Sequence, residues 1–232
     1  GADKNLMLGE MAEFANAGYV VASIYYRSSA QGHYPDQLLD VKTAVRFLRA
    51  NAQKYEIDPE RVGVFGRSAG GHLSAMMAMN QDGFDGEEWA GYSSEIQASC
   101  DMFGPVDVRA LMEGEEARFS DPNFRWHRLE DTHGGALIGG DPATMKERAE
   151  LASPVNMVNP KMCPLQILHG DNDPLVPIEK SSEVLYQKIV SAGMEDRVEF
   201  YTFPGAGHGS REFFQDSVKK LQIEFFDRYL KR

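Results

Sequence analysis

The sequence alternates short apolar runs rich in β-branched residues with longer stretches in which apolar residues recur at helical spacing. This alternation is typical of a parallel sheet whose strands are connected by helices. The runs predicted as strands are residues 19–26, 61–65, 98–103, 164–169 and 198–203. We therefore expect an α/β fold with a mainly parallel sheet.

The stretches between these runs predict helices on both sides of the sheet. Their apolar residues follow the i, i+3, i+4 pattern that places one apolar stripe on a helix. The predicted helices are residues 6–17, 35–54, 69–79, 178–192 and 211–230. The alternation has no internal repeat, and the 232 residues fit one domain.

Residues 107–161 differ from the rest of the chain because they are polar and show no clean period. They contain three large aromatic residues, Phe119, Phe124 and Trp126, and two Gly-Gly pairs. An insertion of this length inside a compact domain is usually a lid or a binding element. We expect a small cap over about 107–161 within a single domain that spans 1–232.

Charge and composition exclude several classes of protein. Lys and Arg number 24 against 35 Asp and Glu, which gives a net charge of −11 and argues against nucleic-acid binding. No apolar run reaches the roughly 18 residues of a membrane span. Cys100 and Cys163 are too few for a disulfide framework and are expected to be buried thiols. Neither metal-ligand spacing nor a nucleotide-binding glycine motif is present, so we expect no metal and no cofactor.

Residues 66–70 read Gly-Arg-Ser-Ala-Gly, which matches G-x-S-x-G. The motif follows a predicted strand and precedes a predicted helix, the setting of a nucleophile elbow. A Cβ at Gly66 or Gly70 is expected to collide with the crossing strand or helix. The helix that follows directs free N–H groups toward Ser68. The alternative is a glycine-rich turn in which the serine only caps the helix.

A nucleophilic serine needs a base, and the base needs a residue that orients it. Of six histidines, His208 lies in a glycine-rich turn after the last predicted strand, where a loop could bring its ring over Ser68. The alternative for His208 is an exposed loop histidine. The turn after the preceding strand offers two acids, Asp171 and Asp173. Asp171 is nearer the strand end and is the more plausible turn-shaping residue.

The other five histidines are interpreted as structural. His72 lies one helical turn past Ser68 and is expected to point into the packing behind the elbow, while His169 ends a strand. His33 lies on a loop that could rim the site. His127 and His133 belong to the expected cap.

Several separate motifs support one resemblance. They are Tyr-Arg at 26–27, Tyr-Pro with a following Asp at 34–40, Asp-Pro-Glu-Arg-Val at 58–62, Gly-Arg-Ser-Ala-Gly-Gly-His-Leu at 66–73, Ala-Ser-Pro-Val at 152–155, His-Gly-x-x-Asp-Pro-x-Val-Pro at 169–177 and Gly-His-Gly at 207–209. Together they make nearly the whole chain resemble the α/β-hydrolase superfamily. Within it, the chain is most similar to bacterial esterase/lipase-like enzymes related to the hormone-sensitive-lipase group and to acetylxylan and feruloyl esterases.

The resemblance implies a role for each matching residue. Ser68 would be the nucleophile, Asp173 the acid and His208 the base, and Ala69 would supply one N–H of the oxyanion hole. The implied reaction is hydrolysis of a small-molecule ester, with a short-chain or carbohydrate-linked acyl group, through an acyl-enzyme. The alternatives are a peptidase or amidase of the prolyl-oligopeptidase type and an inactive relative. The compartment stays open between cytoplasmic and secreted.

The sequence departs from the resemblance at its beginning. The His-Gly-Gly-Gly-type loop that completes the oxyanion hole in such enzymes does not occur in the sequence. Three strands of the family would precede residues 19–26, and the third would lie between that run and residues 61–65. We expect the sheet to close this gap, to take a strand from another copy in a homo-oligomer, or to be completed by residues outside this sequence.

Overall fold

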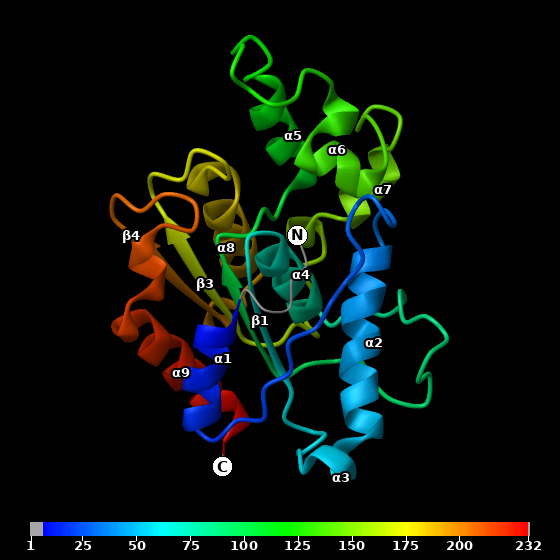
Figure 1. Ribbon diagram of the computed structural model, residues 1–232, viewed down its shortest axis with the longest axis vertical. Coiled ribbons are helices and arrows are strands. Elements are labelled where there is room, and N and C mark those ends of the chain that lie inside the picture. Colours follow the sequence, from blue (N-terminus) through cyan, green and yellow to red (C-terminus); the bar gives the residue numbers. More distant parts are fainter. Residues whose placement is uncertain (1–6, 232) are drawn as a thin grey trace.

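A four-stranded parallel sheet organises the chain, in the order β1-β2-β3-β4 (Figure 1). The computed structural model describes residues 7–231. The strands are β1 (Gly63–Arg67), β2 (Ala98–Met102), β3 (Leu165–Gly170) and β4 (Val198–Phe203). These strands confirm the predicted parallel sheet and four of its five predicted runs.

Helices cover both faces of this sheet and enclose two apolar clusters. They are α1 (Leu8–Asn16), α2 (Asp36–Ala50), α3 (Ala52–Tyr55), α4 (Ala69–Ala78), α8 (Ser182–Ser191) and α9 (Asp216–Leu230). One cluster joins α2, α4 and α8 to the sheet, and the other joins α1 and α9 to it. Ile167 and Leu168 are neighbours on β3 and enter different clusters, as the alternation of side chains along a strand requires.

Three predicted helices have boundaries that differ from the expectation. The helix expected over 35–54 ends at Ala50 and continues as the short α3. The helices expected over 178–192 and 211–230 begin with 3-10 turns, η3 (Ile178–Lys180) and η5 (Arg211–Phe214). A further 3-10 turn, η4 (Glu195–Arg197), leads into β4. Helix ends are set by local capping, so shifts of this size leave the topology unchanged.

The polar segment 107–161 is built from short helices. They are α5 (Val108–Glu116), η1 (Leu129–Asp131), α6 (His133–Ile138), α7 (Lys146–Leu151) and η2 (Pro154–Asn156). Figure 1 shows α5, α6 and α7 grouped beyond the end of the sheet toward which the strands point. The buried Glu115 carboxylate accepts hydrogen bonds from the backbone N–H groups of His133 and Gly134 and thereby joins α5 to α6. Helices this short give no resolvable hydrophobic period.

The strand predicted over residues 19–26 is wrong. The segment runs through the structure without joining a ladder, and Val20 and Tyr25 are 60% and 59% exposed. A strand needs a hydrogen-bonded partner. No strand within residues 7–231 pairs with the outer edge of β1, and a cavity separates this edge from segment 19–26. Segment 19–26 has the apolar pattern of a strand, but within residues 7–231 no strand lies beside it to pair with.

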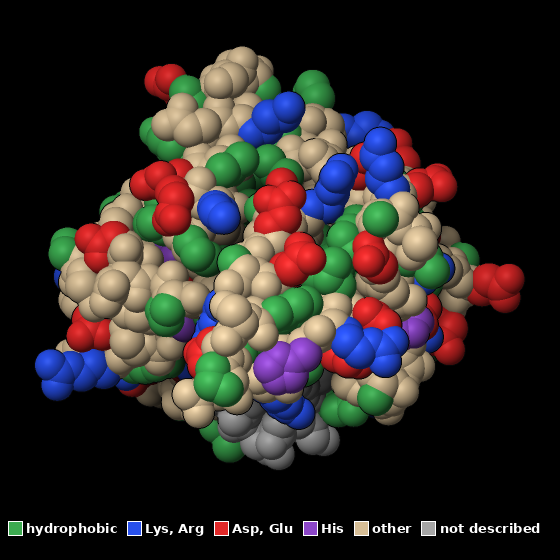
Figure 2. All heavy atoms as spheres, turned by 90° about the horizontal axis from the view of Figure 1, so that it is seen from above, with side chains coloured by type: hydrophobic (Ala, Val, Ile, Leu, Met, Phe, Trp, Pro, Cys, Tyr) green, Lys and Arg blue, Asp and Glu red, His purple; other side chains and the backbone are tan. Residues whose placement is uncertain are grey.

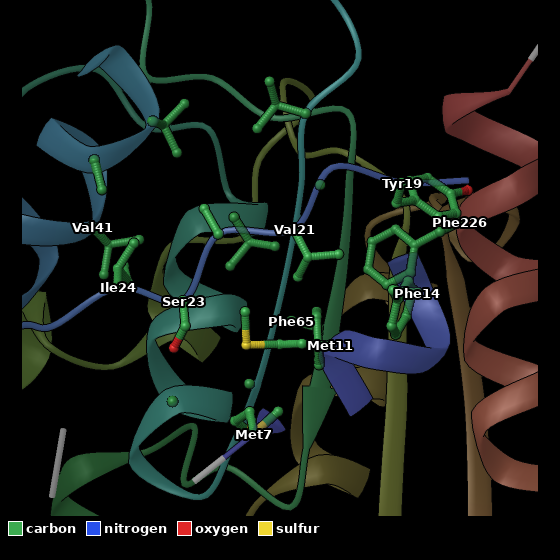
Figure 3. A pocket seen from close by; sticks show the side chains of 18 of the residues that line it. Met7, Met11, Phe14, Tyr19, Val21, Ser23, Ile24, Val41, Phe65 and Phe226 are labelled. Atoms are coloured by element: carbon green, nitrogen blue, oxygen red, sulfur yellow. The ribbon is translucent and has the colours of Figure 1, made fainter. Parts of the chain in front are cut away.

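That cavity measures about 750 Å³ and lies between segment 19–26 and β1, with α1, α2 and α9 contributing to its walls. Figure 3 shows Val21, Ile24 and Phe65 among the apolar side chains around it. Ser68 also lines it. The described residues therefore do not close the gap in the sheet, which removes the first of the three expected outcomes.

Charged side chains of both signs share the face seen in Figure 2, which views the molecule from the end that carries segment 107–161. Acidic groups lie between Lys and Arg side chains, with apolar side chains exposed among them. No helix within residues 7–231 is both long and apolar enough to cross a membrane. Cys100 and Cys163 are free and buried, as predicted, and burial raises the pKa of each thiol to about 12.

Candidate active site

Ser68 lies in a sharp turn between β1 and α4. Its backbone has φ 53° and ψ −116°, a conformation that residues other than glycine rarely adopt. The Ser68 N–H donates to the carbonyl of Met102 at 2.9 Å, which fixes the turn against the end of β2. The strained turn therefore has the geometry expected of a nucleophile elbow, at the carboxyl end of β1.

Close packing explains only some of the glycines around this turn. A Cβ at Gly66 would lie 2.4 Å from the carbonyl oxygen of Gly70, as expected. The expectation for Gly70 is wrong, because a Cβ there would meet nothing within 4 Å. Gly71 is the crowded position instead, since its Cβ would lie 2.4 Å from Asp101 Oδ1. Gly71 packs on the end of β2, whereas Gly70 lines the cavity.

The structure brings the three predicted residues Ser68, His208 and Asp173 into one hydrogen-bonded chain. His208 Nε2 lies 2.8 Å from Ser68 Oγ, and His208 Nδ1 lies 2.7 Å from Asp173 Oδ2. A carboxylate only accepts, so Nδ1 carries the proton and Nε2 is left to accept from the serine hydroxyl. The arrangement has the order and the atom pairing of a nucleophile, its base and the acid that orients the base.

Asp173 is held at both carboxylate oxygens. Its side chain is fully buried, and Oδ1 accepts the backbone N–H groups of Leu175 and Val176 at 2.9 Å each. Burial by itself would raise the pKa of Asp173. Hydrogen bonds from His169, His208 and the Val176 N–H outweigh burial and hold this pKa well below its usual range. Asp173 is therefore charged throughout the physiological pH range.

Asp171, the other candidate acid, bonds to the turn after β4. Its Oδ1 accepts the N–H of Gly205 at 2.6 Å, and the N–H of Asn172 donates to the carbonyl of Ala206 at 3.1 Å. These two bonds connect the turn after β3 with the turn after β4. Asp171 thus shapes the turns, the role that its place at the strand end suggested, and the His208 loop is fixed relative to the Asp173 loop.

An aromatic residue that the sequence analysis missed packs on the imidazole of His208. The rings of Phe103 and His208 meet edge to face with centroids 5.0 Å apart, and Phe213 packs behind Phe103 at 4.7 Å. Phe103 has a positive φ of 46°, which turns the chain after β2. This backbone conformation accompanies the contact of Phe103 with His208, and no sequence pattern indicates it.

Ala69 is the first residue of α4, and it lines the same cavity as Ser68 and His208. The first N–H groups of a helix have no partner within the helix and carry the positive end of its dipole. The Ala69 N–H therefore stands beside Ser68 with the charge that suits an oxyanion.

Two of the remaining histidines serve packing. His72 is buried behind the elbow, as predicted, with Nδ1 3.0 Å from the Pro105 carbonyl, and burial lowers its pKa to about 4. His33 Nδ1 lies 2.9 Å from the carbonyl of Ala136 and so connects the loop before α2 to segment 107–161. His127 and His133 both belong to that segment. Across residues 7–231 no group of three or more His, Cys, Asp or Glu side chains is arranged to hold a metal.

Comparisons with known proteins agree with this fold. The family model described as BD-FAE matches residues 1–189. Esterase LipC of Mycobacterium tuberculosis is 31% identical over 201 residues, which make up 86% of this chain and 47% of LipC. The chain thus spans less than half the length of this curated relative.

Two solved structures are also similar. A truncated form of a carbohydrate esterase from gut microbiota superposes with a TM-score of 0.81 at 33% identity, covering 95% of this chain and 78% of that one. A bifunctional GH43-CE protein of Bacteroides eggerthii gives a TM-score of 0.80 at 28% identity, covering 94% of this chain and 29% of that one. The chain therefore belongs to the BD-FAE family and has an α/β-hydrolase fold.

Proposed function

We propose that this chain carries the active site of a serine carboxylic-ester hydrolase. The observation that supports the proposal most strongly is the continuous hydrogen-bonded chain from Ser68 Oγ through His208 to Asp173, with distances of 2.8 and 2.7 Å. The strained turn at Ser68 and the helix that begins at Ala69 add the other two requirements, a partly exposed nucleophile and a donor for the oxyanion.

The reaction follows from these atoms. Ser68 Oγ attacks the ester carbonyl carbon while His208 Nε2 takes the hydroxyl proton, and the oxyanion accepts the Ala69 N–H. His208 then gives the proton to the departing alcohol, which leaves an acyl group on Ser68. Water repeats the two proton transfers and releases the acid. Throughout, Asp173 keeps the imidazole in the correct tautomer and stabilises its cation.

Among residues 7–231, the Ala69 N–H is the donor that we assign to the oxyanion. A second donor is typically worth a factor of about 10² to 10³ in rate. The cavity beside Ser68 lies next to the edge of β1 that no strand within residues 7–231 pairs with, so a segment that extends the sheet on that side would lie close to Ser68. We infer that the rate of this chain increases when such a segment is present, whether it comes from the same polypeptide or from a second copy.

The substrate we favour is a short-chain or carbohydrate-linked acyl ester. Helices α5, α6 and α7 of segment 107–161 lie beyond the carboxyl ends of the strands, where Ser68 and His208 also lie, and we propose that they act as a small cap over them (Figure 1). Two similar structures are described as a carbohydrate esterase and as a GH43-CE protein.

The test is hydrolysis of p-nitrophenyl acetate, butyrate and octanoate, acetylated xylan and a prolyl p-nitroanilide. Wild type is compared with Ser68→Ala and with Ser191→Ala, a matched change at an exposed position on α8. We expect acetate and butyrate to be cleaved faster than octanoate, with loss only in Ser68→Ala. Cleavage of the prolyl anilide without ester hydrolysis would favour a peptidase, and a folded wild type no faster than Ser68→Ala would refute the proposal.

A further inference from the structure

We propose that His169 is a positioning residue that holds the Asp173 carboxylate in place for His208. This inference rests on the proposed function, because it assigns a partner to the acid of that site. His169 lies on β3, one residue before the strand ends, and it is four residues before Asp173. Both side chains are fully buried, so the contact between them is shielded from water.

Both ring nitrogens of His169 have partners. Nε2 lies 2.9 Å from the Val176 carbonyl oxygen and 3.4 Å from Asp173 Oδ2, and Nδ1 lies 2.6 Å from Ser182 Oγ. A carbonyl oxygen only accepts, so Nε2 carries a hydrogen, which the Val176 carbonyl and the Asp173 carboxylate share. Nδ1 is held by its hydrogen bond with the hydroxyl of Ser182. The ring is thus fixed from two sides, by the turn after β3 and by the start of α8.

The contact completes the set of donors around Asp173. Oδ1 has two backbone N–H groups, and Oδ2 has His208 Nδ1 and His169 Nε2. Of the two donors at Oδ2, His208 exchanges protons with Ser68 and the leaving group during the reaction, whereas His169 is locked by Val176 and Ser182. His169 therefore keeps Asp173 Oδ2 in position to accept from His208 Nδ1 while His208 exchanges protons.

Two variants of similar size distinguish the contacts of His169 Nε2 from those of His169 Nδ1. In His169→Gln the amide nitrogen can reach the place of Nε2 and donate to Val176 and Asp173. In His169→Asn the amide can reach only the place of Nδ1. We expect His169→Asn to lower kcat about ten-fold to hundred-fold, the range for one lost hydrogen bond to a charged group, with KM within about two-fold of wild type. His169→Gln should recover kcat to within about five-fold.

A double variant distinguishes positioning from general support of the fold. If His169 acts through Asp173, then His169→Asn should change the residual activity of Asp173→Asn by less than about two-fold. An equal loss in both backgrounds would overturn the proposal, and so would a His169→Gln variant as impaired as His169→Asn. Circular dichroism and Tm show whether each variant is folded, and the Gln variant carries the test if the Asn variant is not.

A measurement without substrate separates this proposal from the proposed function. The hydrogen on His208 Nδ1, bonded to Asp173, should give a proton NMR resonance far downfield of the amides in wild type and in His169→Gln. It should broaden or shift upfield in His169→Asn. An unchanged resonance in folded His169→Asn overturns the positioning role even if wild type hydrolyses no ester tested. Absence of hydrolysis with the expected NMR pattern overturns only the proposed function.

Discussion

The carboxyl end of β3 and the outer side of β1 both adjoin the candidate site, but they are built very differently. Every residue of β3 is buried, and the strand pairs with β2 on one side and β4 on the other. In β1 only Gly66 is buried, and within residues 7–231 the strand pairs with β2 alone. A cavity of about 750 Å³ lies where a second partner of β1 would be.

The difference shows which parts of the site the chain determines by itself. The proposed acid and base are fixed by turns that bond to one another, through Asp171 and Gly205 and through Asn172 and Ala206. The proposed nucleophile, Ser68, is fixed by its turn, and a cavity lies on its other side. We expect changes on the β3 side to have large effects and equivalent changes on the β1 side to have small ones.

The largest effect is expected for the acid. Asp173→Asn leaves the shape of the site but removes the charge that stabilises the His208 cation and selects its tautomer, so kcat/KM should fall about 10³-fold to 10⁴-fold. Asp171→Asn, the matched change in the same turn, keeps an oxygen that can accept the Gly205 N–H and should cost less than about three-fold. Equal losses in steady-state ester hydrolysis would contradict the assignment of these two residues.

A second pair compares burial on the two sides. Ile167 on β3 is fully buried, whereas Ile24 is partly buried beside the cavity. Ile167→Ala should lower the free energy of unfolding by about 2–5 kcal/mol, through lost burial and a new void. Ile24→Ala removes the same atoms where a void already exists and should cost less than about 1.5 kcal/mol. Urea denaturation measures both, and similar losses would show that the cavity is closed in solution.

A third pair compares adjacent glycines of α4. Gly71→Ala forces a methyl group against Asp101 and should destabilise the chain by about 1–3 kcal/mol. Gly70→Ala meets nothing within 4 Å and improves helix propensity, so stability should stay constant or rise by up to about 1 kcal/mol. Denaturation midpoints check the order. A larger loss from Gly70→Ala would mean that the cavity side of the elbow is occupied.

The smallest effect concerns a second buried carboxyl, Asp101 on β2. Burial raises its pKa to about 6, against a hydrogen bond from the Gly104 N–H and attraction to His169, and its other oxygen has no hydrogen-bond partner within residues 7–231. A pKa raised on folding means that ionised Asp101 destabilises the native state above about pH 6, and that this cost disappears as the pH falls below about 4. Asp101→Asn should therefore gain about 1 kcal/mol at pH 7.5 relative to its effect at pH 5.5. A pH-independent difference in urea stability would contradict this.

Much of the fold was predictable because local patterns determine it. The runs that became β2, β3 and β4 were located within two residues at each end, since apolar runs between helices admit few other interpretations. The prediction for segment 19–26 failed because its pattern is that of a strand, while strand formation also needs a partner strand beside it. A sequence pattern describes one segment at a time, and pairing depends on two.

In the candidate site, too, some residues could be predicted from the sequence and others could not. Ser68 and His208 could be named from the motifs that follow β1 and β4, and the family resemblance selected Asp173 over Asp171 after β3. The contacts of Phe103 and His169 could not be named, because they depend on a positive φ and on a bond made across a buried turn. The spacing of four between His169 and Asp173 was visible in the sequence, but spacing in a turn does not determine which side chains meet.

The central claim is that Ser68 is activated by His208 and Asp173, and covalent labelling tests it most directly. Native chain, chain unfolded in urea and the His208→Ala variant would be treated with a fluorophosphonate and digested for mass spectrometry. We predict one adduct on the peptide that contains Ser68, formed rapidly only in the native wild type. Labelling of Ser68 no faster in the native wild type than in the other two samples, or an adduct confined to another serine, would contradict the claim.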